Sequence, residues 1–250
     1  LVRSPEDFEK NGVHIHLQNR AAKILPNSKQ VLIEDLVSKK AFLVCYDKLI
    51  IAIGARPIVP PIKNVNLKNV FTIRKIEDGI AIREMAEKSQ NAAIIGGGYI
   101  GIEMLEALVK QNVYVTLIEY APTIMQTFDE DMSHLILEQL KFTCGNRFEI
   151  LTSEMATEFS GDNEGVKSVR TGSGREIPVD FVVLCAGVVP NTEIARDAEI
   201  AIGETGAIKV NERMETNIPD IFACGDCVEE NLLITNTKIW LPLGTNANKE

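Results

Sequence analysis

One glycine-rich segment, I-I-G-G-G-Y-I-G at residues 94–101, restricts the fold more than any other part of this sequence. The apolar run that leads into it, residues 92–95, is typical of a buried β-strand. From about residue 99 to 111, the apolar residues have the spacing of an amphipathic helix. A second apolar strand is predicted at residues 113–118. The glycines therefore join a strand to a helix within a strand–helix–strand unit.

The three glycines Gly96, Gly98 and Gly101 have the spacing G-x-G-x-x-G, which in this setting indicates a dinucleotide-binding site. Gly96 would permit the tight turn, Gly98 would let a diphosphate approach the main chain, and Gly101 would let helix and strand pack closely. Unpaired N–H groups at the start of the helix would attract the phosphates. The alternative is a merely structural turn.

An acidic residue, Glu119, follows the second strand about 20 residues after the glycines, as a dinucleotide site requires. Its carboxylate can accept hydrogen bonds from the two hydroxyls of the adenine ribose and would repel a 2′-phosphate. The next residues, Tyr120–Pro122, include no arginine or lysine to bind such a phosphate. The sequence therefore favours NADH over NADPH. The alternative is that Glu119 is only a solvated strand end.

The order of the predicted elements indicates an α/β fold built on a parallel sheet. Helices are predicted at residues 76–88 and 129–142, and a run of strands follows between residues 148 and 185. The segment Arg56–Pro61 contains three prolines and is predicted to be an extended linker out of a first domain. Residues 12–17 alternate polar and apolar side chains, which predicts a half-buried strand.

The charge of the chain argues against two classes of partner. The formal net charge is −9, and an acidic surface repels both nucleic acid and anionic lipid. No apolar run is long enough to cross a bilayer, and residues 1–10 lack the apolar core of a signal peptide. We therefore expect a cytoplasmic protein with neither a nucleic-acid nor a membrane partner.

The five cysteines are scattered and odd in number, which argues against a disulfide framework. Cys45, Cys185 and Cys224 lie in or beside apolar runs and are predicted to be buried thiols. Cys224 and Cys227 form a C-x-x-C pair, for which a redox dithiol or half of a zinc site is the alternative. The sequence contains no second such pair, so no metal site is expected.

Four stretches together resemble the pyridine nucleotide–disulfide oxidoreductase superfamily, and within it the branch of NADH oxidase, NADH peroxidase and coenzyme A-disulfide reductase. They are Y-D-K-L-I-I-A-I-G-A-R-P at 46–57, I-I-G-G-G-Y-I-G-I-E-M at 94–104, V-T-L-I-E-Y-A-P-T-I-M at 115–125 and I-P-D-I-F-A-C-G-D-C at 218–227. The closing W-L-P-L-G-T-N-A-N-K at 240–249 is also similar to that branch.

The resemblance implies an α/β fold of the glutathione reductase type, with a Rossmann-like NAD-binding domain inserted into an FAD-binding domain. Residues 1–70 and 191–250 would belong to the FAD-binding domain, and residues 71–190 would form the NAD-binding domain. The family's N-terminal FAD-binding unit, its redox-active cysteine and its C-terminal dimerisation domain have no counterpart here. We therefore expect an inactive fragment of a homodimeric parent protein, with a partial FAD-binding domain.

The resemblance also assigns residues to the NAD site. NADH would lie along Gly96–Gly101, which includes Ile100. Tyr99 matches the aromatic residue that covers the flavin and moves aside when nicotinamide enters. Glu103 matches a glutamate near the nicotinamide, and Gly187 matches a glycine at the domain junction. From the residues alone, Tyr99 could instead pack on the sheet, and Glu103 could simply provide a favourable charge near the helix N-terminus.

Three further segments match the family's FAD contacts. Ala52–Ala55 resembles an FAD-contacting turn in which Gly54 allows close approach of the main chain and Ala55 follows it. In Gly225–Asp226, the Asp226 carboxylate would accept a hydrogen bond from a ribityl hydroxyl. The latter pair follows a predicted buried strand, at the end where α/β sheets bind ligands, although a simple turn is the alternative. Thr245 and Asn246 resemble the start of a helix whose dipole would stabilise negative charge on the flavin.

These features predict an oxidoreductase that transfers hydride from NADH to FAD and on to a small-molecule acceptor: a disulfide, a peroxide or oxygen. The parent protein would be similar to NADH oxidase or coenzyme A-disulfide reductase. Two alternatives remain open. One is an NAD-binding module without catalysis, and the other is a flavoprotein similar to ferredoxin or rubredoxin reductase.

Overall fold

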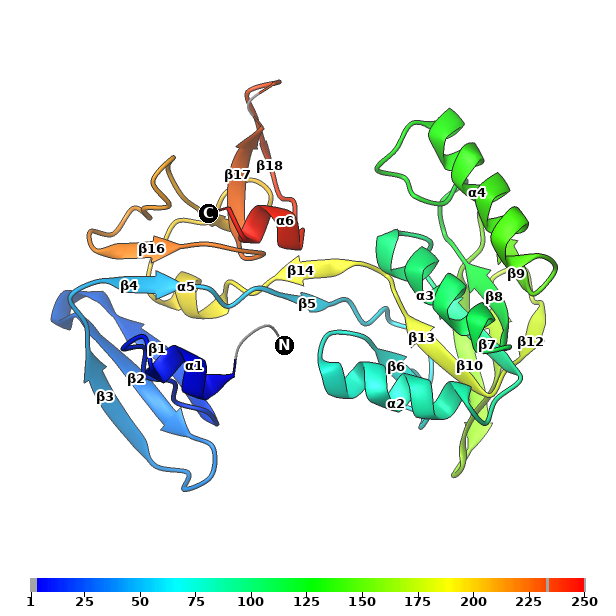
Figure 1. The fold of residues 1–250 in the computed structure, drawn as a ribbon, viewed down its shortest axis with the longest axis horizontal. Coiled ribbons are helices and arrows are strands. Elements are labelled where there is room, and N and C mark those ends of the chain that lie inside the picture. Colours follow the sequence, from blue (N-terminus) through cyan, green and yellow to red (C-terminus); the bar gives the residue numbers. More distant parts are fainter. Residues whose placement is uncertain (1–3, 233, 250) are drawn as a thin grey trace. The chain divides into compact units, whose positions relative to one another are not determined.

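The computed structural model describes residues 4–232 and 234–249. The chain forms two compact units. The first comprises Leu1–Ala55 and Pro190–Glu250, and the second comprises Arg56–Val189, so the second is inserted into the first along the chain. Both units combine helices with strands, which confirms the predicted α/β class (Figure 1).

A five-stranded parallel sheet, in the order β6-β13-β7-β8-β9, is the framework of the second unit (Figure 1). Its side chains alternate between two separate cores: Ala92 and Ile94 belong to one, and Ala93 and Ile95 to the other. The sheet is therefore buried on both faces, which explains the continuous apolar runs of its strands. The strands are β6 (Val70–Thr72), β7 (Asn91–Ile95), β8 (Tyr114–Ile118), β9 (Phe148–Leu151) and β13 (Phe181–Leu184).

Different elements cover the two faces of this sheet. Helices supply Ile82, Leu105 and Leu140 to one core, whereas an antiparallel three-stranded sheet supplies Phe159 and Val169 to the other. All three predicted helices are present, although parts of their apolar stripes are exposed: Ile82 and Leu140 lie in the core, whereas Ile80 is 52% exposed. The helices are α2 (Ile76–Ala86), α3 (Tyr99–Lys110) and α4 (Glu130–Cys144), and the antiparallel strands are β10 (Ala156–Asp162), β11 (Gly165–Thr171) and β12 (Glu176–Pro178).

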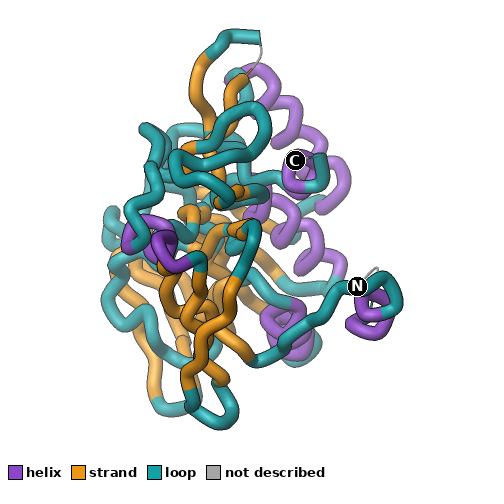
Figure 2. The backbone as a smooth tube through the Cα atoms, turned by 90° about the vertical axis from the view of Figure 1, so that its left-hand side faces the viewer, coloured by secondary structure: helices purple, strands orange, loops and turns teal. Residues whose placement is uncertain are grey.

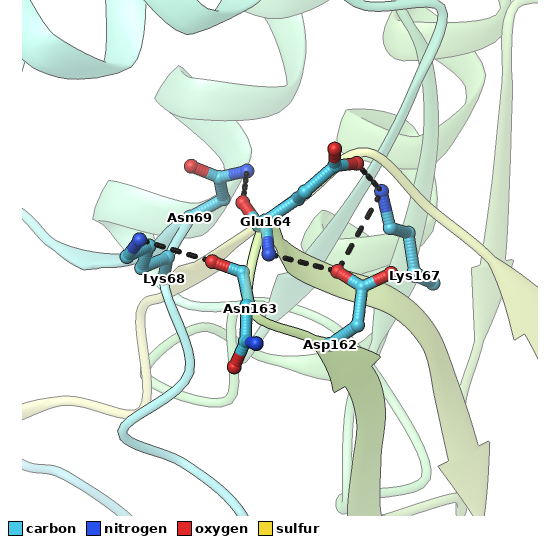
Figure 3. Close-up of polar contacts among 6 residues, drawn as sticks. All are labelled: Lys68, Asn69, Asp162, Asn163, Glu164 and Lys167. Carbon is cyan, nitrogen blue, oxygen red and sulfur yellow. Dashed lines mark hydrogen bonds and ion pairs between the residues drawn. The ribbon is translucent and has the colours of Figure 1, made fainter.

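The structure assigns residues 56–70 to the second unit, whereas the sequence-based boundary lies at residue 70. Figure 3 shows contacts that attach this segment to the turn between β10 and β11. Lys68 Nζ donates a hydrogen bond to the main-chain oxygen of Asn163 at 2.9 Å, and Asn69 Nδ2 donates to that of Glu164 at 3.4 Å. These bonds join residues that are far apart in sequence, which is why the pattern of the segment alone does not reveal them.

Short strands and long loops make up the first unit, and Figure 2 shows how much of the backbone consists of loops. A parallel pair, β4 (Leu49–Ile51) with β16 (Ile221–Ala223), contributes Ile51, Ile221 and Ala223 to its core. Its other strands are β1 (Asn19–Leu25), β2 (Gln30–Asp35), β3 (Ala41–Cys45), β15 (Ile208–Lys209), β17 (Val228–Leu232) and β18 (Thr237–Ile239). Its helices are α1 (Pro5–Glu9), η1 (Pro26–Ser28), α5 (Glu193–Asp197) and α6 (Gly244–Ala247).

Two further short strands lie where the chain passes between the units. They are β5 (Ala55–Pro57) and β14 (Val188–Pro190), and they pair with each other.

The prediction of a strand at residues 12–17 is wrong. The chain forms a turn and a loop there, and β1 begins only at Asn19, where its pairing with Asp35 starts. Both Val13 and Leu17 are exposed, so the alternation of polar and apolar residues has no core to face. A helix that the sequence analysis did not predict precedes this segment at Pro5–Glu9.

The buried ring of Phe181 gives a direct test of the two-core arrangement. Phe181 is fully buried in β13 and packs edge-to-face on Phe71, with 6.3 Å between the ring centroids. We expect Phe181→Ala to lower the free energy of unfolding by about 3–5 kcal/mol, because it removes a core ring and leaves a cavity. Urea unfolding followed by circular dichroism measures this change.

Phe142→Ala is the matched control, since Phe142 is 84% exposed on α4. It should change the free energy of unfolding by less than about 0.5 kcal/mol. Equal effects of the two substitutions would contradict the assignment of Phe181 to the core.

Candidate dinucleotide and flavin sites

Two glycines of the motif are required by the fold itself. Gly96 has a φ of +110°, and a Cβ there would lie 2.3 Å from the main-chain oxygen of Cys185. A Cβ on Gly101 would lie 2.0 Å from the main-chain oxygen of Gly96. Such contacts exclude every side chain, so these glycines allow α3 to start directly against the end of β7.

Gly98 differs from both, because the fold does not require a glycine there. Apart from the adjacent stretch of its own chain, no atom of the described residues lies within 4 Å of the position that a Cβ would take. Gly98 is the N-cap of α3, and none of the described side chains caps that helix. The first N–H groups of a helix have no partner within the helix, so they can bind an anion such as a diphosphate.

The carboxylate of Glu119 faces the glycine turn. Its Oε1 accepts a hydrogen bond from the main-chain N–H of Ala121 at 2.7 Å, and its Oε2 accepts one from Gly97. The side chain is half-buried, so Glu119 is not merely a solvated strand end. A carboxylate can accept about four hydrogen bonds, which leaves capacity for ribose hydroxyls. The sequence analysis did not predict that Glu119 also organises the turn.

The predicted residues of α3 lie at and after its first turn. Tyr99 is 42% exposed, so it does not pack into the sheet, and Ile100 and Glu103 are exposed as well. The Tyr99 hydroxyl accepts a hydrogen bond from Thr127 Oγ1 at 3.0 Å, and the ring meets the edge of Phe128 at 5.9 Å. The roles of Thr127 and Phe128 were missed, because nothing in the sequence pattern links residues 28 positions apart.

Gly187 lies outside the glycine turn, near the end of the second unit. It has a φ of +93°, and its main-chain oxygen accepts a hydrogen bond from Ile58 N at 2.9 Å. Its position therefore joins the segments by which the chain enters and leaves this unit. Among the described residues, no main-chain hydrogen bond joins Gly187 to the turn at residues 96–101.

The candidate FAD residues of the first unit come together at one edge of its sheet. Because β4 and β16 are parallel, Gly54 and Gly225 both follow the carboxyl ends of neighbouring strands. Both have positive φ, +63° and +74°, which favours glycine. Asn191, which the sequence analysis missed, fixes this edge by donating to the main-chain oxygens of Ile53 and Gly54.

The last candidate segment lies beside this edge. A Cβ on Gly225 would lie 3.8 Å from the Cβ of Ala247, the last residue of α6. Thr245 and Asn246 belong to this helix, which has four residues. The neighbouring Asp226 is half-buried, and its main-chain oxygen accepts a hydrogen bond from Trp240 Nε1 at 3.0 Å. The glycine conformations and the short helix fit a bound group such as the flavin dinucleotide.

The C-x-x-C pair is not a reactive dithiol. Cys227 is buried, and its Sγ donates to the main-chain oxygen of Cys224 at 3.2 Å. Burial raises the pKa of Cys227, and it raises the pKa of Cys185 to about 12. The prediction of burial is confirmed for Cys185 and wrong for Cys45, because the whole of β3 is exposed; Cys224 is half-buried. The structure describes all five cysteines, and each is a free thiol.

Among the described residues, no three His, Cys, Asp or Glu side chains are grouped so that they could hold a metal ion. Within residues 4–232 and 234–249, no helix combines the length and apolar character that crossing a membrane requires.

The parallel sheet, the glycine turn and the acidic residue after the next strand define a Rossmann-like dinucleotide-binding fold. The chain belongs to the pyridine nucleotide-disulphide oxidoreductase family, whose model matches residues 4–247. This match confirms the family predicted from the sequence. Members of the family are FAD- and NAD(P)-dependent oxidoreductases.

Individual relatives agree with this assignment. A NAD(P)H coenzyme A polysulfide/persulfide reductase from Pyrococcus horikoshii is 37% identical over 249 residues, which cover 98% of this chain and 54% of that protein. The structure of reduced Bacillus anthracis CoADR-RHD matches with a TM-score of 0.93 at 32% identity, over 100% of this chain and 44% of that one. The NADH-bound water-forming NADH oxidase from Lactobacillus brevis matches with a TM-score of 0.91 at 29% identity, over 99% of this chain and 54% of that one. The chain thus spans about half the length of the relatives it matches.

The burial of the thiols predicts which cysteine reacts in the folded protein. Ellman's reagent reacts with thiolates, and a buried thiol with a raised pKa supplies little thiolate at about pH 8. Because burial raises their pKa, Cys185 and Cys227 should react with Ellman's reagent only after unfolding, whereas exposed Cys45 should react at once. Cys45→Ser should remove the fast phase. Rapid loss of the Cys227 thiol from folded protein would contradict this assignment.

Proposed function

We propose that the chain is the NADH-binding and part of the FAD-binding portion of an oxidoreductase that transfers hydride from NADH to FAD. One observation carries the proposal: the Glu119 carboxylate accepts a hydrogen bond from Gly97, the residue next to the open position at Gly98. Relatives named for NADH oxidation and for NAD(P)H-dependent persulfide reduction support it. In domain terms, residues 71–190 would bind NADH, and residues 1–70 with 191–250 would contain the FAD-binding portion, although residues 56–70 pack with the second unit.

Each end of the NADH site has a distinct task. The N–H groups after Gly98 would bind the diphosphate, and Glu119 would accept hydrogen bonds from the adenine ribose. Tyr120, which follows, is 77% exposed and carries no positive charge that could bind a 2′-phosphate, and the Glu119 carboxylate would repel one. This arrangement favours NADH over NADPH. Tyr99, Ile100 and Glu103 would line the path of the nicotinamide half.

The FAD residues would have holding roles. Gly54, Ala55 and Gly225 would let the main chain approach the cofactor, and Asp226 would accept a hydrogen bond from a ribityl hydroxyl. Thr245 and Asn246 would contact it from α6. When bound, FAD supplies a group that takes up hydride and passes electrons on to the acceptor.

The acceptor would be a small molecule, and the named relatives include a polysulfide or persulfide reductase and a water-forming oxidase. The described thiols of the C-x-x-C pair do not suit electron transfer, because Cys227 is buried with a raised pKa. By family resemblance, the redox-active thiol would belong to another part of the whole protein. By family resemblance, the whole protein would be a cytoplasmic homodimer.

The substitution Gly98→Ala should weaken NADH binding without changing the stability of the fold. Gly98 has φ −80°, which alanine adopts freely, and its surroundings are open, so the free energy of unfolding should change by less than about 0.5 kcal/mol. The added methyl should nevertheless obstruct the diphosphate and weaken NADH binding by at least about tenfold, or about 1.4 kcal/mol. Fluorescence titration with NADH and urea unfolding measure the two quantities.

Gly101→Ala provides the comparison, because its Cβ would meet the Gly96 carbonyl. It should lower the free energy of unfolding by about 1–3 kcal/mol through overpacking. If Gly98→Ala binds NADH as tightly as the unaltered protein, the diphosphate does not lie at Gly98.

Glu119→Gln tests the ribose contact and the preference for NADH. Hydrogen bonds to a charged group contribute about 1.5–3 kcal/mol, so NADH binding should weaken by about 10-fold or more. Affinity for NADPH should change less, because the substitution also removes a repelling charge. Glu106→Gln is the control, because it alters only an exposed ion pair between Glu106 and Lys110 of α3. It should leave both affinities unchanged. An unchanged ratio of the two affinities would refute the assignment.

A further inference from the structure

Two turns of the first unit, at the carboxyl ends of β4 and β16, each contain a glycine in the left-handed conformation. Gly54 has a φ of +63° and Gly225 a φ of +74°. Glycine permits this conformation, but it also gives the backbone more freedom than any other residue does. A cofactor that binds a flexible turn has to order it, which reduces the affinity unless the protein already restrains the turn. Groups that restrain these two turns would therefore strengthen the binding of a cofactor there.

The turn at Gly54 is restrained by Asn191. Asn191 Nδ2 donates a hydrogen bond to the main-chain oxygen of Ile53 at 2.8 Å, and Asn191 N donates one to that of Gly54 at 2.9 Å. These two oxygens belong to the two peptide groups that flank Gly54. Neither peptide group can rotate without breaking a bond to Asn191, so one residue opposes the freedom that the glycine introduces.

The turn at Gly225 is restrained by Trp240. The main-chain oxygen of Gly225 accepts a local bond from Val228 N at 3.0 Å. The next carbonyl, that of Asp226, instead accepts a bond from Trp240 Nε1 at 3.0 Å. The strands β17 and β18 form an antiparallel hairpin after the turn, and the hairpin returns Trp240 to a residue 14 positions earlier. A distant side chain thus holds each of the two turns by a main-chain oxygen.

The two turns are also joined to each other. Cys224 N donates a hydrogen bond to the main-chain oxygen of Ile51 at 3.0 Å. The buried Cys227 Sγ donates to the same oxygen at 3.6 Å and to that of Cys224 at 3.2 Å. These bonds hold the ends of β4 and β16 together, but they do not reach the peptide groups that flank Gly54. The bonds from Asn191 supply that restraint.

We propose that Asn191 and Trp240 are positioning residues that restrain the two glycine turns before FAD binds and thereby strengthen its binding. This inference rests on the proposed function, which assigns FAD to these turns. Both residues act through main-chain oxygens, so neither has to touch the cofactor. A turn that is already ordered loses less conformational entropy when the cofactor binds. The affinity for NADH should not depend on these bonds, because Gly98 and Glu119 belong to the second unit.

Trp240→Phe and Asn191→Ala each remove one side-chain donor. Phenylalanine keeps an aromatic ring without the N–H group, and alanine at 191 still allows the main-chain bond to Gly54. Each substitution should weaken FAD binding by about 2- to 10-fold, the effect of one lost hydrogen bond, and should leave NADH binding unchanged. Both affinities are measured by fluorescence titration of the whole protein after its FAD has been removed.

Asn217→Ala is the matched control. Asn217 lies in the same unit, and its Nδ2 donates to the main-chain oxygen of Glu199 at 3.2 Å while its Oδ1 accepts from Ala201 N at 2.7 Å. The substitution therefore also removes bonds between a side chain and the main chain, but at neither turn. It should leave the FAD affinity unchanged, even where urea unfolding shows that it lowers stability as much as Asn191→Ala does.

Amide hydrogen exchange tests the restraint itself in the same FAD-free protein. Exchange at residues 53–55 should become faster in Asn191→Ala, and exchange at residues 225–228 should become faster in Trp240→Phe. Residues of β7 and β8 should keep their protection in both variants. Faster exchange throughout the first unit would indicate a general loss of structure and would contradict the inference, as would unchanged exchange at both turns.

The binding results separate the inference from the proposed function. If both variants bind FAD as tightly as the unaltered protein, the inference is wrong and the proposed function stands. Equal losses of affinity for FAD and NADH would also overturn the inference, because a local restraint cannot act on both sites. If the unaltered FAD-free protein fails to bind FAD, the assignment of FAD to these turns is wrong, and the inference fails with it.

Discussion

The structure of the second unit depends on the close approach of Gly101 to the carbonyl of Gly96. No residue with a side chain fits between them, and this contact lets α3 begin directly at the end of β7. The Cys185 carbonyl closes the other side of Gly96, which ties β13 to the same turn. Everything that we assign to dinucleotide binding follows from this compact joint, because it directs the free N–H groups of α3 toward one small region.

The motif therefore combines two kinds of glycine. Gly96 and Gly101 serve the fold, since a Cβ at either would meet main-chain atoms, whereas Gly98 lies in open space. Glu119 also has two tasks: it fixes the turn through main-chain N–H groups and keeps capacity for a ligand. A residue that both shapes a site and contacts its ligand makes the two properties hard to alter separately.

The helices and strands that could be predicted from the sequence are those whose own pattern of apolar residues indicates the element. The strands at 92–95 and 113–118 are continuous apolar runs that the sheet buries on both faces. The three long helices were predicted from the spacing of apolar residues, of which the structure buries only a part. The prediction of a strand at residues 12–17 is wrong because alternating polar and apolar residues do not by themselves provide a partner strand. The prediction that Cys45 is buried is wrong because the apolar residues of β3 are exposed. A helix at Pro5–Glu9 was missed although Ser4 and Asp7 form a capping box.

The candidate site shows the same division. Its glycines and Glu119 were predictable because their spacing follows from the strand–turn–helix unit. Three contributions were not: the bonds from Asn191 to the turn at Gly54, and those of Thr127 and Phe128 to Tyr99. Each joins segments that are far apart in the chain, and only the folded arrangement brings such partners together.

The pairing of β5 with β14 has a consequence for how such a chain could evolve. The segments by which the chain enters and leaves the second unit are neighbours, and a hydrogen bond from Ile58 N to Gly187 O closes them just inside. A unit of more than a hundred residues thus begins and ends at two paired segments of the chain. Loop-closure entropy grows only slowly with length, so such a cassette can be gained, lost or exchanged with little disturbance to the segments that flank it.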